Sequence, residues 1–197
     1  MPSTSKYAGP FVYIVGQSLL GQTLAAASPR GLCMLAFAHS RGELVKDALL
    51  RFPGAAPAPT RHPAMKWLQQ AVKHVGTPWE KPAFPLDLLG TPFQRKVWRA
   101  LRRIPAGRTA SYQDIARALG APKASRAVAG ACGANPVSIT VPCHRILHRN
   151  GSISGYRWGV KRKQKLLALE ATHAARSIRI ARTSRTTRKA SPLVRRL

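Results

Sequence analysis

Cys143 lies in the pentapeptide Val141-Pro142-Cys143-His144-Arg145, beside two residues that could activate a thiol. The thiolate is the nucleophilic form of cysteine, and a neighbouring base or cation raises its population. The preceding residues, Ile139-Thr140-Val141, are apolar and β-branched, so we expect a strand-like segment leading to the thiol. A buried cysteine that packs as a small hydrophobic residue is the alternative interpretation.

The charge of the chain favours a polyanionic partner. The 197 residues include 33 Lys and Arg against 6 Asp and Glu, a formal net charge of +27. Such an excess attracts nucleic acid before other partners. Residues 91–170 carry sixteen basic and two acidic groups, and residues 171–197 carry eight basic groups and no acid. We therefore expect residues 91–170 to face the polyanion, with the last segment as an accessory.

The three cysteines, Cys33, Cys132 and Cys143, form no CxxC pair and no cluster with zinc-ligand spacing. This usage argues against a disulfide framework and a structural metal, and it suits a reducing cytosol. The sequence has no apolar run of about eighteen residues that could span a bilayer. The apolar run at residues 11–15 is too short for a signal peptide. We expect a soluble, cytoplasmic protein.

The pattern of expected strands and helices predicts an α/β fold of the α+β type with two domains. In residues 1–85, short apolar runs up to Ser40 and a turn signal at residues 28–31 indicate a small antiparallel sheet. Apolar periodicity predicts helices at residues 41–52 and 63–75. Nothing in this unit suggests catalysis, so we expect it to act as a scaffold. A linker with three prolines follows at residues 77–90.

Residues 86–170 are predicted to be a mostly helical domain. Thr91 is suited to cap a helix that has Pro92 at its first position. Ser111 and Asp114 have the spacing of a capping box, which predicts a second helix. A third is expected at residues 122–132. The last two, joined by a short turn with a glycine, have the layout of a helix-turn-helix, which many helix pairs that bind no DNA share.

The helix expected at residues 122–132 carries almost only small side chains, with Lys123 and Arg126 near its start. Tight packing inside the protein would explain them, and so would insertion into a DNA groove. The surrounding charge favours the groove. Further on, the loop at residues 154–159 is suited to lining a flat ligand or to packing on the core. A last helix at residues 160–170 and a disordered basic tail at residues 171–197 complete the expected organisation.

Seven ordered motifs between residues 90 and 170 closely resemble those of the O6-alkylguanine-DNA alkyltransferases, also called methylated-DNA–protein-cysteine methyltransferases. They are Gly90-Thr91-Pro92-Phe93-Gln94, Ser111-Tyr112-Gln113, Pro122-Lys123-Ala124-Ser125-Arg126-Ala127-Val128, Asn135-Pro136, Val141-Pro142-Cys143-His144-Arg145, Gly151-Ser152-Ile153-Ser154-Gly155-Tyr156 and Leu166-Leu167-Ala168-Leu169-Glu170. Residues 156–160 look most like the C-terminal half of the bacterial adaptive-response protein.

The resemblance implies repair by direct reversal. The family moves an alkyl group from O6 of guanine in double-stranded DNA to its own cysteine, irreversibly and once per molecule. It implies binding in the minor groove and a base flipped out of the stack. Such an alkyl transfer needs no metal and no cofactor, and residues 1–85 lack the Cys and His set with which some relatives hold zinc, so we expect neither. We expect a monomer, associated with the nucleoid when bound to DNA.

The resemblance also assigns roles to residues. Cys143 is the acceptor, His144 takes the thiol proton through a water, Glu170 orients that histidine, and Tyr112 helps the purine to leave. Arg126 fills the gap that the flipped base leaves. The further DNA-binding positions are Lys123, Ser125, Ala127 and Asn135, the last as a hinge residue. The pocket positions are Tyr156, Arg157, Trp158 and Lys163, and we expect Arg157 and Trp158 to make a narrow pocket that favours methyl over benzyl groups.

Three alternatives stay open on the sequence. Alkyltransferase-like proteins share the fold and bind lesions without chemistry, but they lack the acceptor cysteine. A helix-turn-helix transcription factor is the second, a role that the full adaptive-response protein has only with an additional N-terminal unit carrying four zinc-bound cysteines. A Cys-His hydrolase is the third. A hydrolase would not explain the positive charge of the chain or the small side chains of the helix expected at residues 122–132.

Overall fold

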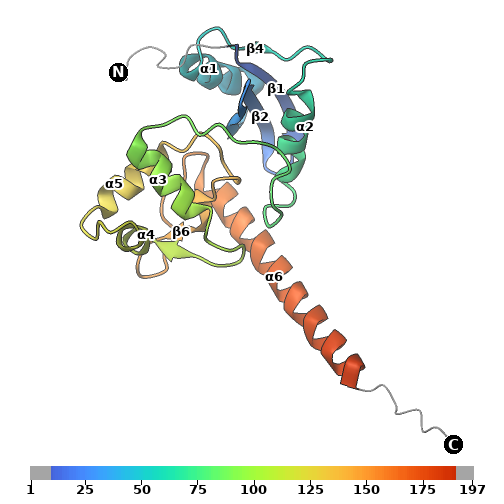
Figure 1. Ribbon diagram of the computed structural model, residues 1–197, viewed down its shortest axis with the longest axis vertical. Coiled ribbons are helices and arrows are strands. Elements are labelled where there is room, and N and C mark those ends of the chain that lie inside the picture. Colours follow the sequence, from blue (N-terminus) through green and yellow to red (C-terminus); the bar gives the residue numbers. More distant parts are fainter. Residues whose placement is uncertain (1–9, 190–197) are drawn as a thin grey trace, which may run out of the picture.

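The computed structural model describes residues 10–189, and the side chains of residues 10–179. It has a mixed α/β fold in which a small sheet with two helices lies beside a mostly helical part (Figure 1). The elements are β1 (Val12–Ser18), β2 (Gly21–Ser28), β3 (Gly31–Ala38), α1 (Arg41–Arg51), β4 (Ala56–Pro57), α2 (Met65–His74), α3 (Pro92–Leu101), β5 (Ala110–Ser111), α4 (Tyr112–Ala118), α5 (Ser125–Gly133), the 3-10 helix η1 (Cys143–Arg145), β6 (Ile146–Leu147) and α6 (Val160–Lys189).

The first sheet has the strand order β3-β2-β1-β4. Its three long strands form the predicted antiparallel meander, and the short β4 adds a parallel edge next to β1. Helices α1 and α2, both predicted, pack on this sheet. Strand β3 is buried along almost its whole length because the helical part also packs against it.

Strand β3 joins the sheet to the helical part through backbone hydrogen bonds. Leu35 donates to the carbonyl of Pro136 at 2.9 Å and accepts from the amide of Ser138 at 3.0 Å. Leu32 similarly donates to the carbonyl of Pro85 at 2.8 Å. The sheet therefore holds in place the chain that runs from Pro136 towards Cys143.

The helices α3 and α4 begin at the residues predicted from their caps. Thr91 and Gln94 form a capping box at the start of α3, and Ser111 and Asp114 form one at the start of α4. Each box satisfies amide groups that have no partner inside the helix. The parallel pairing of β5 with β6 then brings Tyr112, the first residue of α4, close to the segment that follows η1.

The strand-like segment expected at residues 139–141 is a turn. Ile139 has a φ of +66°, a left-handed conformation that is rare for a β-branched residue. The side chain of Asn135 accepts from the amide of Val137 at 3.0 Å and donates to the carbonyl of Val141 at 2.8 Å. These bonds close the turn and compete with pairing in a sheet.

Two helix boundaries also differ from the prediction. Helix α5 begins at Ser125 and not at residue 122, because residues 121–124 form a turn in which Ala124 donates to Ala121 at 2.8 Å. Helix α6 does not end at Glu170 but continues to Lys189, away from the rest of the molecule (Figure 1). No glycine or proline interrupts residues 160–189, so nothing in the backbone stops the helix. Residues 190–197 of the expected tail lie outside the described residues.

Candidate active site around Cys143

The thiol of Cys143 lies at the start of η1 and is 6% exposed. The side-chain amide of Asn135 donates to its Sγ at 3.2 Å. The same amide group holds the carbonyl of Val141, so Asn135 fixes both the turn and the sulfur at its end. Asn135 itself is fully buried. It therefore lies behind the thiol and cannot itself contact DNA in this conformation.

His144 and Glu170 form a buried pair behind Cys143. Nε2 of His144 lies 2.9 Å from Oε1 of Glu170, and both side chains are almost inaccessible to solvent. Burial lowers the pKa of His144, although its hydrogen bond to Glu170 raises it in part. The histidine is therefore neutral near pH 7. Its other ring nitrogen, Nδ1, is buried without a hydrogen-bond partner among the described residues.

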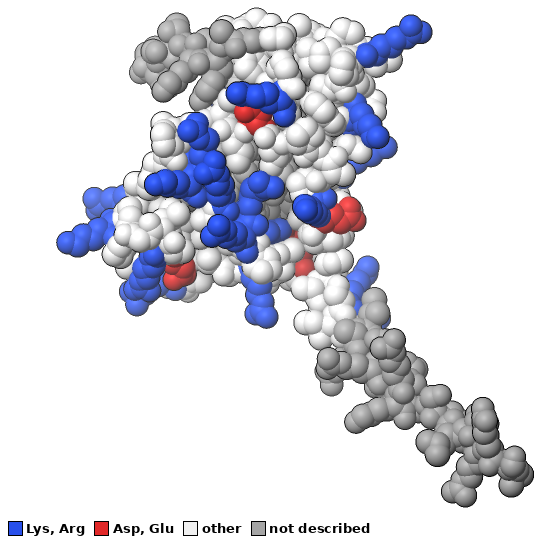
Figure 2. Space-filling model, in the orientation of Figure 1, with Lys and Arg blue, Asp and Glu red and all other residues white. Residues whose placement is uncertain are grey.

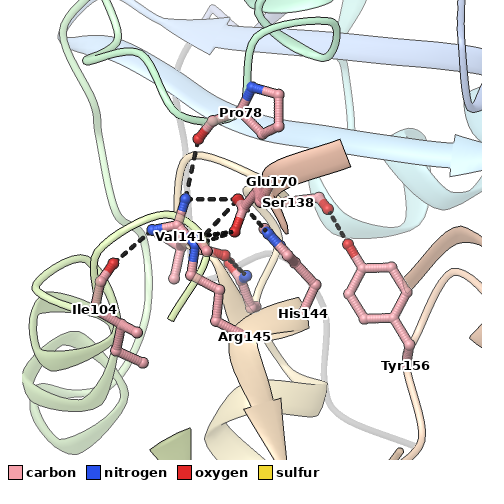
Figure 3. Close-up of polar contacts among 10 residues, drawn as sticks. Pro78, Ile104, Ser138, Val141, His144, Arg145, Tyr156 and Glu170 are labelled. Carbon is pink, nitrogen blue, oxygen red and sulfur yellow. Dashed lines mark hydrogen bonds and ion pairs between the residues drawn. The ribbon is translucent and has the colours of Figure 1, made fainter. Parts of the chain in front are cut away.

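Arg145, expected from its place beside Cys143 to help activate the thiol, completes the network around Glu170 instead. Its guanidinium donates to the Glu170 carboxylate at 2.7–3.1 Å, and to the carbonyls of Ile104 at 2.6 Å and Pro78 at 3.0 Å (Figure 3). The amide of Gly107 also donates to Glu170, at 3.1 Å. The signal in the sequence was that Glu170 is one of two acids among sixteen basic groups, so that an arginine partner was to be expected.

The pKa values follow from these contacts. Burial raises the pKa of Glu170, but the hydrogen bonds from His144 and Arg145 outweigh it and lower the pKa to about 2. Burial raises the pKa of Cys143 to about 11, although the Asn135 amide and the Lys163 ammonium favour the thiolate. At neutral pH the site thus holds an ionised Glu170, a neutral His144 and a protonated Cys143.

A cavity of about 220 Å³ opens beside the thiol. Its lining includes Cys143, Cys132, Tyr112, Tyr156 and Arg157. Tyr112 comes from α4, Cys132 from α5 and the other two from the loop before α6, so four segments meet at the sulfur. Burial raises the pKa of both phenols, which therefore stay protonated and can donate hydrogen bonds.

The structure does not place Trp158 or Lys163 on this cavity. The indole of Trp158 is buried and meets the ring of Phe37 edge-on at 6.1 Å, so it packs on the first sheet. The ammonium of Lys163 is fully buried and donates to the carbonyl of Ile146 and to the hydroxyl and carbonyl of Ser154. Lys163 thereby holds the loop before α6 against β6, and its charge still acts on the thiol.

The DNA-binding candidates gather around the start of α5. Lys123, Arg126 and Ala127 are exposed, and Ser125 is partly exposed. The buried side of α5 is formed by Val128, Ala131 and Cys132. The exposed side continues through Gly130 and Gly133, where an added Cβ would meet nothing within 4 Å.

Several known proteins resemble this chain in sequence or in fold. The family model for the DNA-binding domain of 6-O-methylguanine DNA methyltransferase matches residues 92–172. The chain is 43% identical to the inducible methylated-DNA–protein-cysteine methyltransferase of Bacillus subtilis, over 65% of this chain and 72% of that protein. It is 34% identical to the Mycobacterium tuberculosis OGT solved in complex with DNA, with a TM-score of 0.67, covering 82% of this chain and 93% of that one.

A longer relative is the bifunctional transcriptional activator and DNA repair enzyme Ada of Escherichia coli. The two sequences are 42% identical over a region that covers 83% of this chain and 46% of that protein. The chain thus spans about half the length of this relative. Within residues 10–189, no helix combines the length and apolarity needed to cross a membrane. In the same range, no group of three or more His, Cys, Asp or Glu residues is arranged to hold a metal ion.

Proposed function

Because the chain belongs to the methylated-DNA–protein-cysteine methyltransferase family, we propose that it repairs O6-alkylguanine in double-stranded DNA by moving the alkyl group to Cys143. One observation carries the proposal: the thiol of Cys143 faces a 220 Å³ cavity while its neighbour His144 is bonded to Glu170. This arrangement supplies a nucleophile, a base and a group that orients the base.

The reaction is an in-line displacement at the alkyl carbon. The bond between sulfur and carbon forms as the bond between carbon and O6 breaks, and the electron pair of that bond stays on the guanine. The thioether that results has no route to hydrolysis, so each molecule reacts once. The step needs a thiolate, a proton donor near the purine and little water, and it needs no cofactor or metal.

The base in this scheme is Nδ1 of His144. Glu170 is ionised and can only accept a hydrogen bond, so Nε2 must carry the ring proton. The lone pair is therefore on Nδ1, which forms no hydrogen bond with any described residue. The family resemblance implies that a water carries the thiol proton to this nitrogen. Glu170 then stabilises the imidazolium that forms, as the acid of a hydrolytic triad does.

The cavity suits a guanine that has left the stack. Tyr112 is partly buried at its wall and keeps its proton, which supports a role in protonating or hydrogen bonding the departing purine. The guanidinium of Arg157 is held by Asp47 of α1 at 3.0 Å and limits the cavity on the loop side. This supports a preference for methyl over bulky benzyl groups. We had expected both Arg157 and Trp158 to narrow the pocket, but only Arg157 lines it.

Helices α4 and α5 form the proposed helix-turn-helix, with α5 in the minor groove. The small residues Ala127, Gly130 and Gly133 lie on its exposed side, so packing inside the protein does not require them. A slim exposed helix is suited to a narrow groove. Arg126, on the same side, would take the place of the flipped base, and Lys123 would contact phosphate.

We also propose the organisation into a scaffold domain at residues 1–85 and a DNA-binding, acceptor domain at residues 86–170. The hydrogen bonds from β3 to Pro136 and Ser138 support the scaffold role, because they fix the segment that leads to Cys143. A single chain carries the nucleophile, the base and the proposed DNA surface, which supports action as a monomer. Action in the cytoplasm, on nucleoid DNA, completes the proposal.

A repair assay tests the proposed function. Duplex DNA with one O6-methylguanine is incubated, in excess over the protein, and the loss of the modified base is measured by digestion and chromatography. We expect the modified base to become guanine, with a yield limited to one base per protein molecule, and no repair by Cys143→Ser. Binding without repair would instead support a lesion-binding protein, and continuous turnover would support a hydrolase.

A further inference from the structure

A second cavity, of about 420 Å³, lies behind the segment that carries Cys143. It reaches this segment at Thr140 and Pro142, immediately before the acceptor. Among the described residues it shares no lining residue with the cavity that holds the thiol. Its other walls come from the linker around Trp79 and from the end of α3. None of the proposed steps of alkyl transfer uses this space.

The cavity is lined by three cations that have no counter-ion among the side chains of residues 10–179. Lys81, Arg102 and Arg103 line it and are exposed. Within residues 10–179, none of the three forms an ion pair with a carboxylate. Glu80 is the acid on the lining, while the charge of Arg145 is already matched by Glu170. The excess of positive charge favours an anionic ligand.

A buried hydroxyl also lacks a partner at this cavity. Thr140 is 6% exposed, and its Oγ1 has no hydrogen-bond partner among the described residues. An unpaired buried hydroxyl is destabilising, and most such groups are bonded in folded proteins. A ligand oxygen in the cavity would accept from Thr140 once this side chain turns its hydroxyl toward the cavity, since Oγ1 has almost no exposed surface in this structure. Phosphate oxygens accept hydrogen bonds from hydroxyl groups and pair with arginine in a bidentate manner.

The volume of this cavity and the indole in its wall indicate a ligand that is larger than a free phosphate ion. The indole of Trp79 lines the cavity and is kept in place by stacking on His173, with 4.1 Å between ring centroids. Ile104, Ile139 and Pro78 add apolar surface. A volume of this size is typical of sites for small organic ligands. We propose that this cavity binds a small organic phosphate of nucleotide size, with the phosphate at Arg102, Arg103 and Thr140 and the organic part against Trp79.

Calorimetric titration of the whole protein with AMP, adenosine and inorganic phosphate tests this proposal. We expect AMP to bind more tightly than either of its parts. Thr140→Val, which keeps the shape and removes the hydroxyl, should weaken AMP binding about tenfold, the effect of one hydrogen bond to a charged group. Arg102→Gln with Arg103→Gln should weaken it further. Arg61→Gln removes an exposed charge elsewhere and should leave the affinity unchanged.

Thermal unfolding of each variant shows whether it is folded before its affinity is compared. Absence of AMP binding to the native protein would overturn the proposal. So would equal affinities for AMP and adenosine, or native affinity in the arginine double variant. If unmodified duplex DNA displaces AMP, the cavity belongs to the DNA-binding surface, and the assignment to a small molecule is wrong. Repair activity does not enter this test.

Discussion

At the scale of single residues, the site keeps its nucleophile protonated in the absence of DNA. Burial raises the pKa of Cys143 to about 11, and the favourable contacts with Asn135 and Lys163 do not reverse this effect. The thiol is thereby protected from reaction with other electrophiles. In the proposed mechanism His144 removes the proton only when an alkylated base occupies the cavity.

The first prediction concerns the pH dependence of this thiol. Without DNA, the rate at which iodoacetamide alkylates Cys143 should rise about tenfold per pH unit from pH 7 to 10, because only the thiolate reacts. It should level off near pH 11. Mass spectrometry of the peptide with Cys143 measures the rate, and Cys143→Ala gives the background from Cys33 and Cys132. A rate that levels off near neutral pH would contradict this account.

The second prediction concerns Glu170. Its pKa is lowered from 4.5 to about 2, so its stabilising effect is present above pH 4.5 and is lost as the pH falls through 2. Glu170→Gln should lower the free energy of unfolding at pH 7 by about 3–5 kcal/mol, because Arg145 then carries a buried charge without a partner. The variant should also lose this part of the acid dependence.

Urea unfolding measured from pH 7 down to pH 2 checks both parts of the prediction. Glu80→Gln is the matched control, since Glu80 is exposed. A loss of stability no greater than that of the control would show that the network around Glu170 does not stabilise the fold.

At the scale of elements, the capping boxes in the sequence were reliable, whereas contacts between side chains of different segments could not be predicted. The capping boxes of α3 and α4 lie within four residues of sequence, so Thr91 and Ser111 could be placed in advance. The turn at residues 139–141 depends on the side chain of Asn135, and the position of Trp158 depends on Phe37. No local sequence pattern indicates such contacts. The sequence therefore predicted a strand at residues 139–141 and a place in the pocket for Trp158.

The third prediction tests the exposed side of α5. Gly130→Leu should preserve or raise the stability of the helix, because an added side chain meets open space and glycine is a poor helix former. It should nevertheless weaken binding to duplex DNA, because the bulk fills the side that we place in the minor groove. Fluorescence anisotropy measures the affinity and thermal unfolding the stability. Gly42→Leu in α1 is the matched control, and equal affinities for the two variants would contradict the placement of α5.

At the scale of the whole molecule, the positive charge is concentrated where DNA is expected. Figure 2 shows Lys and Arg gathered over the helical part, with few Asp and Glu among them. Composition alone predicted this concentration, since residues 91–170 hold sixteen basic and two acidic groups. The extent of α6 could not be predicted, because the composition of residues 171–189 indicates a disordered tail. In the structure these residues continue the helix.

The fourth prediction concerns this extension. Residues 177–197 contain seven basic residues, and removing them leaves the stacking of His173 on Trp79 intact. The truncated protein should bind unmodified DNA more weakly, with a smaller dependence on salt, because fewer counterions are released from the phosphates. Binding measured between 50 and 200 mM salt, the range over which such effects are large, checks this. An unchanged salt dependence would show that the extension does not contact DNA.

If Cys143 receives the alkyl group, as we propose, the mass of the protein must increase during the reaction. The protein is incubated with duplex DNA containing O6-methylguanine, weighed intact, and then digested to locate the change. We expect a gain of one methyl group on the peptide that contains Cys143, and no gain in Cys143→Ala, which keeps Cys33 and Cys132. An unchanged mass, or a methyl group on another residue, would contradict this proposal.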